Sequence, residues 1–276
     1  MNSPATFVDE AAPVARARLS AVIIVKNEAS NIAECLDSLA FCDERIVVDS
    51  GSGDDTLLIA RQKGARVAFH EWSGFGPQKN YALSLAKGEW VLSIDADERV
   101  TPELAAEIHG AIKTDEADGF ELSRMSSFCG RMIRHSGWSP DRVLRLFRRR
   151  KGRFSDDPVH ERVLCDGKVG RLRAPLLHYP VARLEDAIRR MDSYSTISAE
   201  TIAASRRRVS IMTGVAHGTF AFLRAYVLRL GFLDGAAGFM LAVAVAEGSY
   251  YRYMKAWLLQ RERAPARDQQ PFRERQ

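Results

Sequence analysis

Residues 89–99 read Glu-Trp-Val-Leu-Ser-Ile-Asp-Ala-Asp-Glu-Arg, an apolar run that ends abruptly in acids. The apolar part, Trp90 to Ile94, is typical of a buried strand that delivers the acids to a sheet edge. Asp95 and Asp97 stand two residues apart, so in an extended chain their carboxylates point the same way. Such a pair can hold a hard divalent cation, and without one the two charges repel. Alternatively, Asp97 or Glu98 only caps a helix that begins near Pro102.

Three apolar segments precede this stretch at regular intervals. Leu19–Val25, Arg45–Val48 and Arg66–Phe69 predict strands, with helices expected between them. Strands that alternate with helices over short links indicate βαβ units and a mostly parallel, Rossmann-like sheet in an α/β fold. In such sheets ligands bind beyond the carboxyl ends of the strands.

Polar side chains follow three of the four predicted strands, including Trp90–Ile94. They are Lys26-Asn27-Glu28, Asp49-Ser50-Gly51 and Asp95-Ala96-Asp97. We expect them to converge on one edge and to bind a nucleotide. Asp49 suits a hydrogen bond to a base or ribose, although it could equally form an Asx turn. Residues 51–56 and 74–79 both break the G-x-G-x-x-G pattern, and no G-x-x-x-x-G-K-[ST] occurs. The sequence therefore argues against a dinucleotide dehydrogenase and a P-loop ATPase.

Composition points to one large domain, or one domain with an appendage. The chain has 276 residues, of which 46% are hydrophobic and 27% charged, which excludes wholesale disorder. The formal charge is −9 over residues 1–120 and +14 over residues 121–276. This asymmetry favours a cation site and an anionic partner, such as a membrane surface, a phosphorylated substrate or nucleic acid; the alternative is a set of solvated basic faces.

The cysteines and the N-terminal residues carry weaker signals. The four cysteines show no C-x-x-C spacing and indicate reduced thiols, not a zinc site or disulfides. Residues 1–17 contain acids and no apolar core, so we expect a flexible segment and no signal peptide.

The C-terminal part is markedly apolar. A helix is expected from about Leu184 to Ala204, and after it uncharged runs of 15 and 12 residues begin at Val209 and Gly235. Because a spanning helix needs about 18–20 apolar residues, we predict helices that lie in a membrane interface. The alternative is a helical appendage packed on the main domain or on a dimer partner. The residues after about Arg261 are polar and predicted to be disordered.

Seven segments of the chain, taken in order over roughly residues 19–240, resemble family 2 glycosyltransferases. They read SAVIIVKNEASNIAECLDSL, RIVVDSGSGDDT, GFGPQKNYAL, GEWVLSIDADE, DPVHERV, LLHYP and GFLDGAAGF. The chain more narrowly resembles the branch that includes the lipopolysaccharide core heptose β-1,4-glucosyltransferases. Gly53 departs from the pattern, since a threonine is usual there.

The resemblance implies a GT-A nucleotide-sugar-binding fold and an inverting, metal-dependent hexosyltransferase that uses Mg²⁺ or Mn²⁺. The branch implies UDP-glucose as donor and a lipid-linked cell-envelope glycan as acceptor, namely a lipopolysaccharide inner-core heptose. Together with the apolar C-terminal helices, such an acceptor favours a cytoplasmic enzyme that is peripherally associated with the inner face of the cytoplasmic membrane. No nucleic-acid partner is expected, because the sequence has no recognised binding motif and its N-terminal half is acidic. The alternatives are a family 2 transferase for another lipid-linked or polysaccharide acceptor, and a nucleotidyltransferase.

The resemblance also assigns roles to individual residues. Glu161, in a His-Glu pair, would be the general base, and Asp97, Asp95 and His178 would hold the metal. The expected nucleotide-sugar residues are Asn27, Glu28, Asp49, Lys79 and Asp95, and the expected acceptor residues are Trp138, Arg142 and Arg145. Alternatively, Glu161 is a surface residue paired with Arg162, His178 is structural, and Trp138 belongs to the core.

The predicted domain organisation follows from these segments. We expect a flexible N-terminus over 1–17, a GT-A catalytic domain over 18–182, a helical membrane-associating region over 183–260 and a disordered tail over 261–276.

Overall fold

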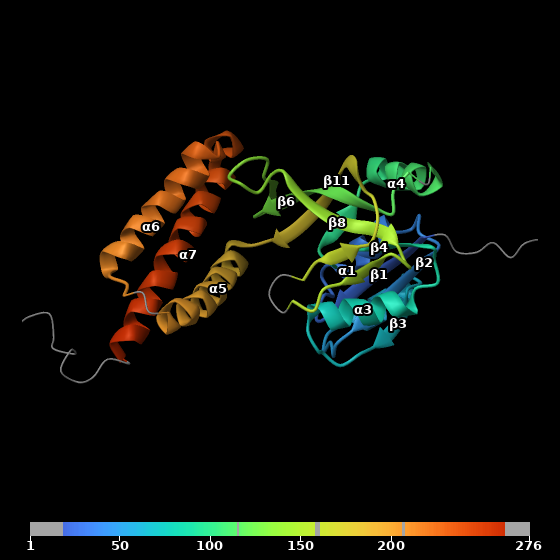
Figure 1. Ribbon diagram of the computed structural model, residues 1–276, viewed down its shortest axis with the longest axis horizontal. Coiled ribbons are helices and arrows are strands. Elements are labelled where there is room, and N and C mark those ends of the chain that lie inside the picture. The colour runs from blue at the N-terminus through green and yellow to red at the C-terminus, as the bar shows by residue number, and fades with distance from the viewer. Residues whose placement is uncertain (1–18, 115, 158–160, 206–207, 263–276) are drawn as a thin grey trace, which may run out of the picture. The chain divides into compact units, whose positions relative to one another are not determined.

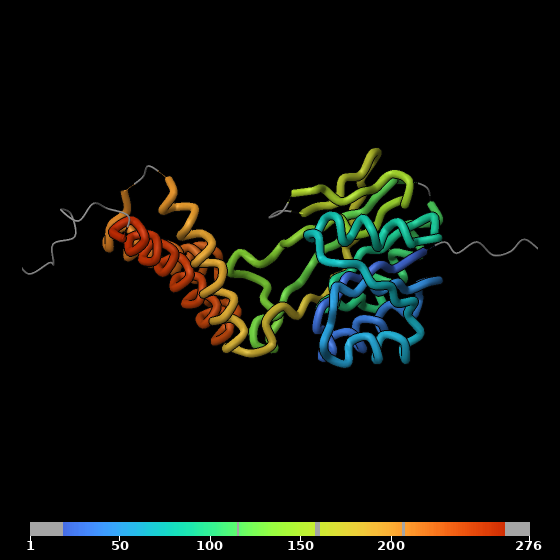
Figure 2. The backbone as a smooth tube through the Cα atoms, turned by 90° about the horizontal axis from the view of Figure 1, so that it is seen from below, coloured from blue at the N-terminus to red at the C-terminus, as the bar shows by residue number. Residues whose placement is uncertain are grey.

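The computed structural model describes residues 19–114, 116–157, 161–205 and 208–262 (Figures 1 and 2). The predictions for the two termini, and His160 of the His-Glu pair, lie outside these residues. The chain divides into two compact units. The first comprises Met1–Ala96, Ile108–Glu121 and Leu144–Arg171, and the second comprises Asp97–Glu107, Leu122–Val143 and Leu172–Gln276.

The first unit contains the predicted parallel strands. β1 (Leu19–Val25), β2 (Glu44–Asp49), β3 (Arg66–Phe69) and β4 (Trp90–Ser93) pair in the order β3-β2-β1-β4. β8 (Asp141–Arg148) adds to β4 in the antiparallel direction, with Leu92 opposite Leu146. Val25 of β1 lies opposite Asp49 of β2, so the carboxyl ends of these two strands are level, as the sequence predicted.

Helices α1 (Ile32–Ser38), α2 (Thr56–Gln62) and α3 (Phe75–Leu85) connect these strands, and β9 (Gly152–Phe154) pairs with β10 (Val163–Cys165). The core holds Val22, Ile46, Val91, Phe147 and Phe154, each at most 2% exposed. Burying a side chain of this size contributes about 1.5–3 kcal/mol. A Cβ on Gly76 of α3 would lie 2.1 Å from the Ser155 carbonyl oxygen, so only glycine allows α3 to approach this closely.

Strands of the second unit are antiparallel. β6 (Gly119–Phe128) pairs with β7 (Arg131–Met132), and β11 (Val169–Val181) pairs with β5 (Glu98–Val100), placing His178 opposite Glu98. β5 is a strand that the sequence did not predict. The cap of α4 (Pro102–Thr114) is Thr101, whose hydroxyl accepts from the Leu104 amide at 3.1 Å, so the alternative that Asp97 or Glu98 caps this helix is wrong.

Helices make up the rest of the second unit. They are α5 (Leu184–Ala204), α6 (Ile211–Leu223), the π-helix η1 (Arg224–Leu228), the 3-10 helix η2 (Gly231–Asp234) and α7 (Gly235–Glu262). α6 packs on α7 through Gly214 and Gly218, and a Cβ on Gly218 would lie 3.2 Å from Tyr250 Cβ. These small residues let the two helices approach closely, side by side in Figure 1.

The segments Ile211–Leu228 and Gly231–Glu262 are long and apolar enough to cross a membrane, by length and composition alone. Both segments are longer than the uncharged runs they contain, because η1 continues α6 through Arg224 and α7 continues well past Glu247. Within the most apolar 18-residue stretch of each segment, the share buried in the protein is 17% for Ile211–Leu228 and 28% for Gly231–Glu262.

Candidate functional site

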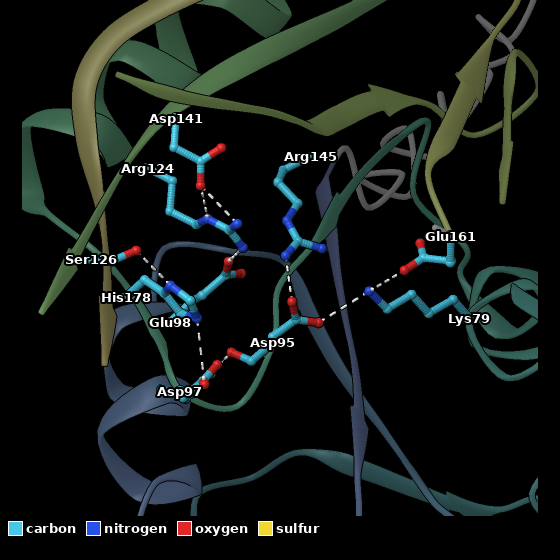
Figure 3. Close-up of polar contacts among 11 residues, drawn as sticks. Lys79, Asp95, Asp97, Glu98, Arg124, Ser126, Asp141, Arg145, Glu161 and His178 are labelled. Carbon is cyan, nitrogen blue, oxygen red and sulfur yellow. Dashed lines mark hydrogen bonds and ion pairs between the residues drawn. The ribbon is translucent and has the colours of Figure 1, made fainter. Parts of the chain in front are cut away.

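Four charged side chains of the first unit form one ion-pair cluster, called here the Asp95 cluster (Figure 3). Lys79 Nζ, from α3, lies 3.1 Å from Asp95 Oδ1 and 3.1 Å from Glu161 Oε2. The guanidinium of Arg145, on β8, pairs with the other Asp95 oxygen. Two cations and two carboxylates therefore balance in this cluster, and Lys79 links Asp95 to the predicted base.

Burial differs within the Asp95 cluster. The side chains of Lys79 and Arg145 are only 6% and 8% exposed, whereas that of Asp95 is 32% exposed. Burial alone would raise the pKa of Asp95, but the Arg145 guanidinium and the Lys79 ammonium outweigh it and hold the pKa well below its usual range. Asp95 is therefore a carboxylate at neutral pH and the counter-charge for two buried cations.

In the second unit, Asp97, His178 and Ser126 form what we call the Asp97 cluster (Figure 3). His178 Nε2 lies 3.5 Å from Asp97 Oδ2, and His178 Nδ1 lies 2.8 Å from the Ser126 hydroxyl. β11 fixes this arrangement, because the Tyr179 amide donates to the Asp97 carbonyl at 2.8 Å. Sequence analysis predicted Asp97 and His178 but not Ser126, which lies inside β6 with no sequence signal.

The chain is not extended from Asp95 to Asp97, as the sequence analysis assumed. β4 ends at Ser93, and Ala96 and Asp97 lie in a turn, so the alternation of an extended strand does not apply. Each carboxylate has its own partners, and within the described residues no group of three or more His, Cys, Asp and Glu side chains could hold a metal.

The donor chemistry of the Asp97 cluster nevertheless fits a divalent cation that a substrate helps to hold. One carboxylate and one imidazole supply two ligands, and Mg²⁺ or Mn²⁺ commonly completes its shell with water and diphosphate oxygens. A ligating histidine usually bonds a second group through its other ring nitrogen, which orients the ring. Ser126 is placed for that role on His178 Nδ1.

Sequence reasoning missed a second network in this unit. Glu98 is fully buried on β5, and its carboxylate lies 3.3 Å from Arg124 Nη1, while Arg124 Nη2 lies 2.7 Å from Asp141 (Figure 3). Removing Arg124 would leave Glu98 buried without this counter-charge, which makes the arginine a structural anchor of β5.

The predicted nucleotide residues of β1 and β2 meet at the loop over residues 50–56. Asp49 accepts from the Gly51 amide at 2.9 Å, which is the Asx-turn alternative. Asn27 Oδ1 accepts from the Gly53 amide at 2.8 Å, and the Glu28 amide donates to Thr56 Oγ1 at 2.8 Å. The predicted convergence of these strand ends is confirmed, and their contact with a nucleotide stays a prediction.

The three predicted acceptor residues have different environments. Trp138 packs edge-on against Phe128, with 6.0 Å between ring centroids, and also lines a cavity of the second unit. Arg142 is exposed on β8, whereas Arg145 belongs to the Asp95 cluster. The odd spacing of the two arginines puts them on opposite faces of the strand.

Comparison with known proteins gives consistent matches. The profile described as Glycosyl transferase family 2 matches residues 20–176. The lipopolysaccharide core biosynthesis glycosyltransferase LpsC of Rhizobium meliloti is 32% identical over 253 residues, which cover 86% of this chain and 90% of that protein. An uncharacterized glycosyltransferase of Rickettsia felis is 29% identical, with 86% and 89% covered.

Among solved structures, S. aureus TarS 1–349 in complex with UDP is 17% identical, with a TM-score of 0.45 and 93% of each chain covered. The family profile covers more than half of this chain, and its range includes the parallel strands of the first unit. The mixed sheet with flanking helices is accordingly GT-A-like, as predicted. The chain belongs to glycosyltransferase family 2.

Proposed function

We propose that this protein is an inverting glycosyltransferase that moves glucose from UDP-glucose onto a lipid-linked cell-envelope glycan, a lipopolysaccharide inner-core heptose. The observation that carries the proposal is the placement of Glu161, whose side chain is 15% exposed and whose carboxylate pairs with Lys79 within the Asp95 cluster. The name of the Rhizobium meliloti relative supports the lipopolysaccharide core as the pathway of the acceptor.

In this mechanism the acceptor hydroxyl oxygen attacks the anomeric carbon of the donor from the face opposite the diphosphate. The new C–O bond forms as the bond to the diphosphate oxygen breaks, and the Glu161 carboxylate takes the hydroxyl proton. The nucleoside diphosphate leaves with the electron pair of the broken bond. An α-linked donor thereby gives a β-linked product.

Asp97, Asp95 and His178 are the proposed metal ligands. When present there, Mg²⁺ or Mn²⁺ supplies positive charge that neutralises the leaving diphosphate. Lys79 orients Glu161 through its 3.1 Å contact, and Asn27, Glu28 and Asp49 bind the nucleotide from the ends of β1 and β2.

Residues 18–182 are proposed as the catalytic domain and residues 183–260 as a region that binds the inner face of the cytoplasmic membrane. The support is the apolar exterior of α6 and its continuation, where Met212, Phe220 and Leu228 are 69%, 58% and 68% exposed. Exposed apolar side chains in this number favour burial in lipid, and Arg224 and Arg229 would meet its headgroups.

The test measures UDP release from UDP-glucose, with Mn²⁺ and detergent-solubilised lipopolysaccharide as acceptor. Glu161→Gln keeps the shape of the side chain but removes the base, so transfer should fall about 10²–10⁴-fold. Glu121→Gln is the matched control. Glu121 Oε2 lies 3.0 Å from Arg171 Nε, and neither residue belongs to the Asp95 cluster.

Turnover by Glu161→Gln within threefold of the unmodified protein would show that Glu161 is not the base. If the unmodified protein released no nucleotide from UDP-, GDP-, CDP- or dTDP-sugars with either metal, the proposed transfer itself would be wrong.

A further inference from the structure

The second unit contains a cavity of about 670 Å³. Its polar lining includes His178 and Ser126 of the Asp97 cluster, together with Arg124. Its apolar lining includes Phe128, Val181 and Leu241, which belong to one buried core cluster. The cavity therefore joins His178, one of the proposed metal ligands, to an apolar wall, and its volume is that of a small-molecule binding site.

Two helices form one wall of this cavity. α5 and α7 run alongside each other, and Gly248 permits the close contact, since its Cβ would lie 3.2 Å from Met191 Cγ. Positions spaced three or four apart lie on one helix face, so each helix presents a stripe to the cavity. These lining positions include Arg190, Tyr194 and Ser198 on α5 and Leu241, Val245 and Arg252 on α7. From Leu241 to Arg252 the wall extends about 16 Å along α7.

The charge of the lining is positive. Arg124 and Asp141 both line the cavity, and the charge of Arg124 is offset by Asp141, at 2.7 Å, and by Glu98, at 3.3 Å. Arg190 and Arg252 also line it, and neither has an ion pair with any carboxylate that the structure describes. Two unneutralised guanidinium groups beside an apolar wall favour an anionic amphiphile, and guanidinium matches phosphate through bidentate hydrogen bonds.

We propose that this cavity binds the phosphorylated, lipid-linked acceptor itself. Phosphate groups of the acceptor bind Arg190 and Arg252, its lipid portion lies on the apolar wall, and its reacting sugar lies beside His178. The inference rests on the proposed function and deepens it. A soluble sugar phosphate would not use the apolar wall, which is why the proposal commits to a lipid-linked acceptor.

The test is a binding titration, so it does not depend on turnover. Lipopolysaccharide in detergent is titrated into the full-length protein, before and after phosphatase treatment, and isothermal titration calorimetry reports binding. Arg190→Gln and Arg252→Gln should each raise the Kd for the untreated glycolipid about tenfold. For the dephosphorylated glycolipid, the same variants should leave the Kd within twofold of the unmodified protein.

Further variants distinguish binding in the cavity from effects of overall charge and hydrophobicity. Arg189→Gln removes a neighbouring arginine that pairs with Asp186 and does not line the cavity, so the Kd should stay unchanged. Val245→Trp fills the cavity and should weaken binding of both glycolipid forms, whereas Val215→Trp, on the exposed face of α6, should not.

Equal effects of Arg189→Gln and Arg190→Gln would overturn the proposal. It would also be overturned if vesicles of phosphatidylethanolamine and phosphatidylglycerol competed for binding as well as lipopolysaccharide, since the arginines would then bind membrane headgroups. Specific binding of the glycolipid without donor turnover would support this binding site and refute the proposed function. Failure of the binding site and failure of the proposed function are therefore distinguishable.

Discussion

Replacing Asp95 with asparagine tests how the Asp95 cluster stabilises the protein. The substitution keeps the size of the side chain but removes the charge that faces Lys79 and Arg145. Both cations are buried, with side chains 6% and 8% exposed, so bulk water cannot replace the lost carboxylate. Glu161 remains beside Lys79, at 3.1 Å, and offsets part of the loss.

Removing one partner of a fully buried ion pair costs about 3–5 kcal/mol. Because the Asp95 side chain is 32% exposed and therefore partly screened, we expect Asp95→Asn to lower the free energy of unfolding by about 2 kcal/mol. For a protein of this size, that corresponds to a fall of roughly 4–8 °C in Tm.

The assay is urea unfolding of the full-length protein in detergent, followed by fluorescence and circular dichroism. Asp37→Asn is the matched control, because Asp37 forms an exposed pair with Lys63 at 2.7 Å, with side chains 57% and 36% exposed. That surface pair should contribute at most about 0.5 kcal/mol.

The pH dependence has a definite sign. The pKa of Asp95 is lowered in the folded state, so its stabilisation is fully present above the unfolded value of about 3.9 and is lost as the pH falls through the folded value. The difference between the unmodified protein and Asp95→Asn should thus be constant from pH 7 to 5 and shrink below about pH 4. A loss no larger than that of Asp37→Asn, or a difference independent of pH, would refute the reasoning.

Three further predictions follow from the geometry. Ser126→Ala should weaken Mn²⁺ binding to the donor-bound protein about 10–100-fold by calorimetry, because His178 loses its orienting bond, while Ser123→Ala should not. Gly218→Leu should lower stability by about 1–3 kcal/mol in thermal unfolding through overpacking against α7, and Ala216→Leu, on the exposed side of α6, should have little effect; equal losses would contradict the packing. Burial raises the pKa of the Cys42 thiol, so iodoacetamide at pH 8 should label Cys42 only after unfolding, as mass spectrometry of its proteolytic peptide would show.

Much of the first unit was predictable because its signals are local. β1 and β3 have the bounds that the sequence predicted, and so does α5 of the second unit, over Leu184–Ala204. A continuous apolar run marks a strand covered on both faces, and a spacing of three to four marks a helix face. β5 escaped prediction because three residues are too few to show a period, and a buried glutamate contradicts the expected pattern.

By itself, the sequence determined the order of strands and helices, the family, and the delivery of acids to the end of β4, since these depend on neighbouring residues. Only the tertiary structure decided the partners of those acids. Arg145 reaches Asp95 because β8 adds to β4 in one antiparallel register, and Ser126 reaches His178 across strands far apart in the chain. Likewise, Arg190 and Arg252 line one cavity because α5 and α7 pack together. Contacts of this kind depend on register and packing between distant segments, which no local periodicity encodes.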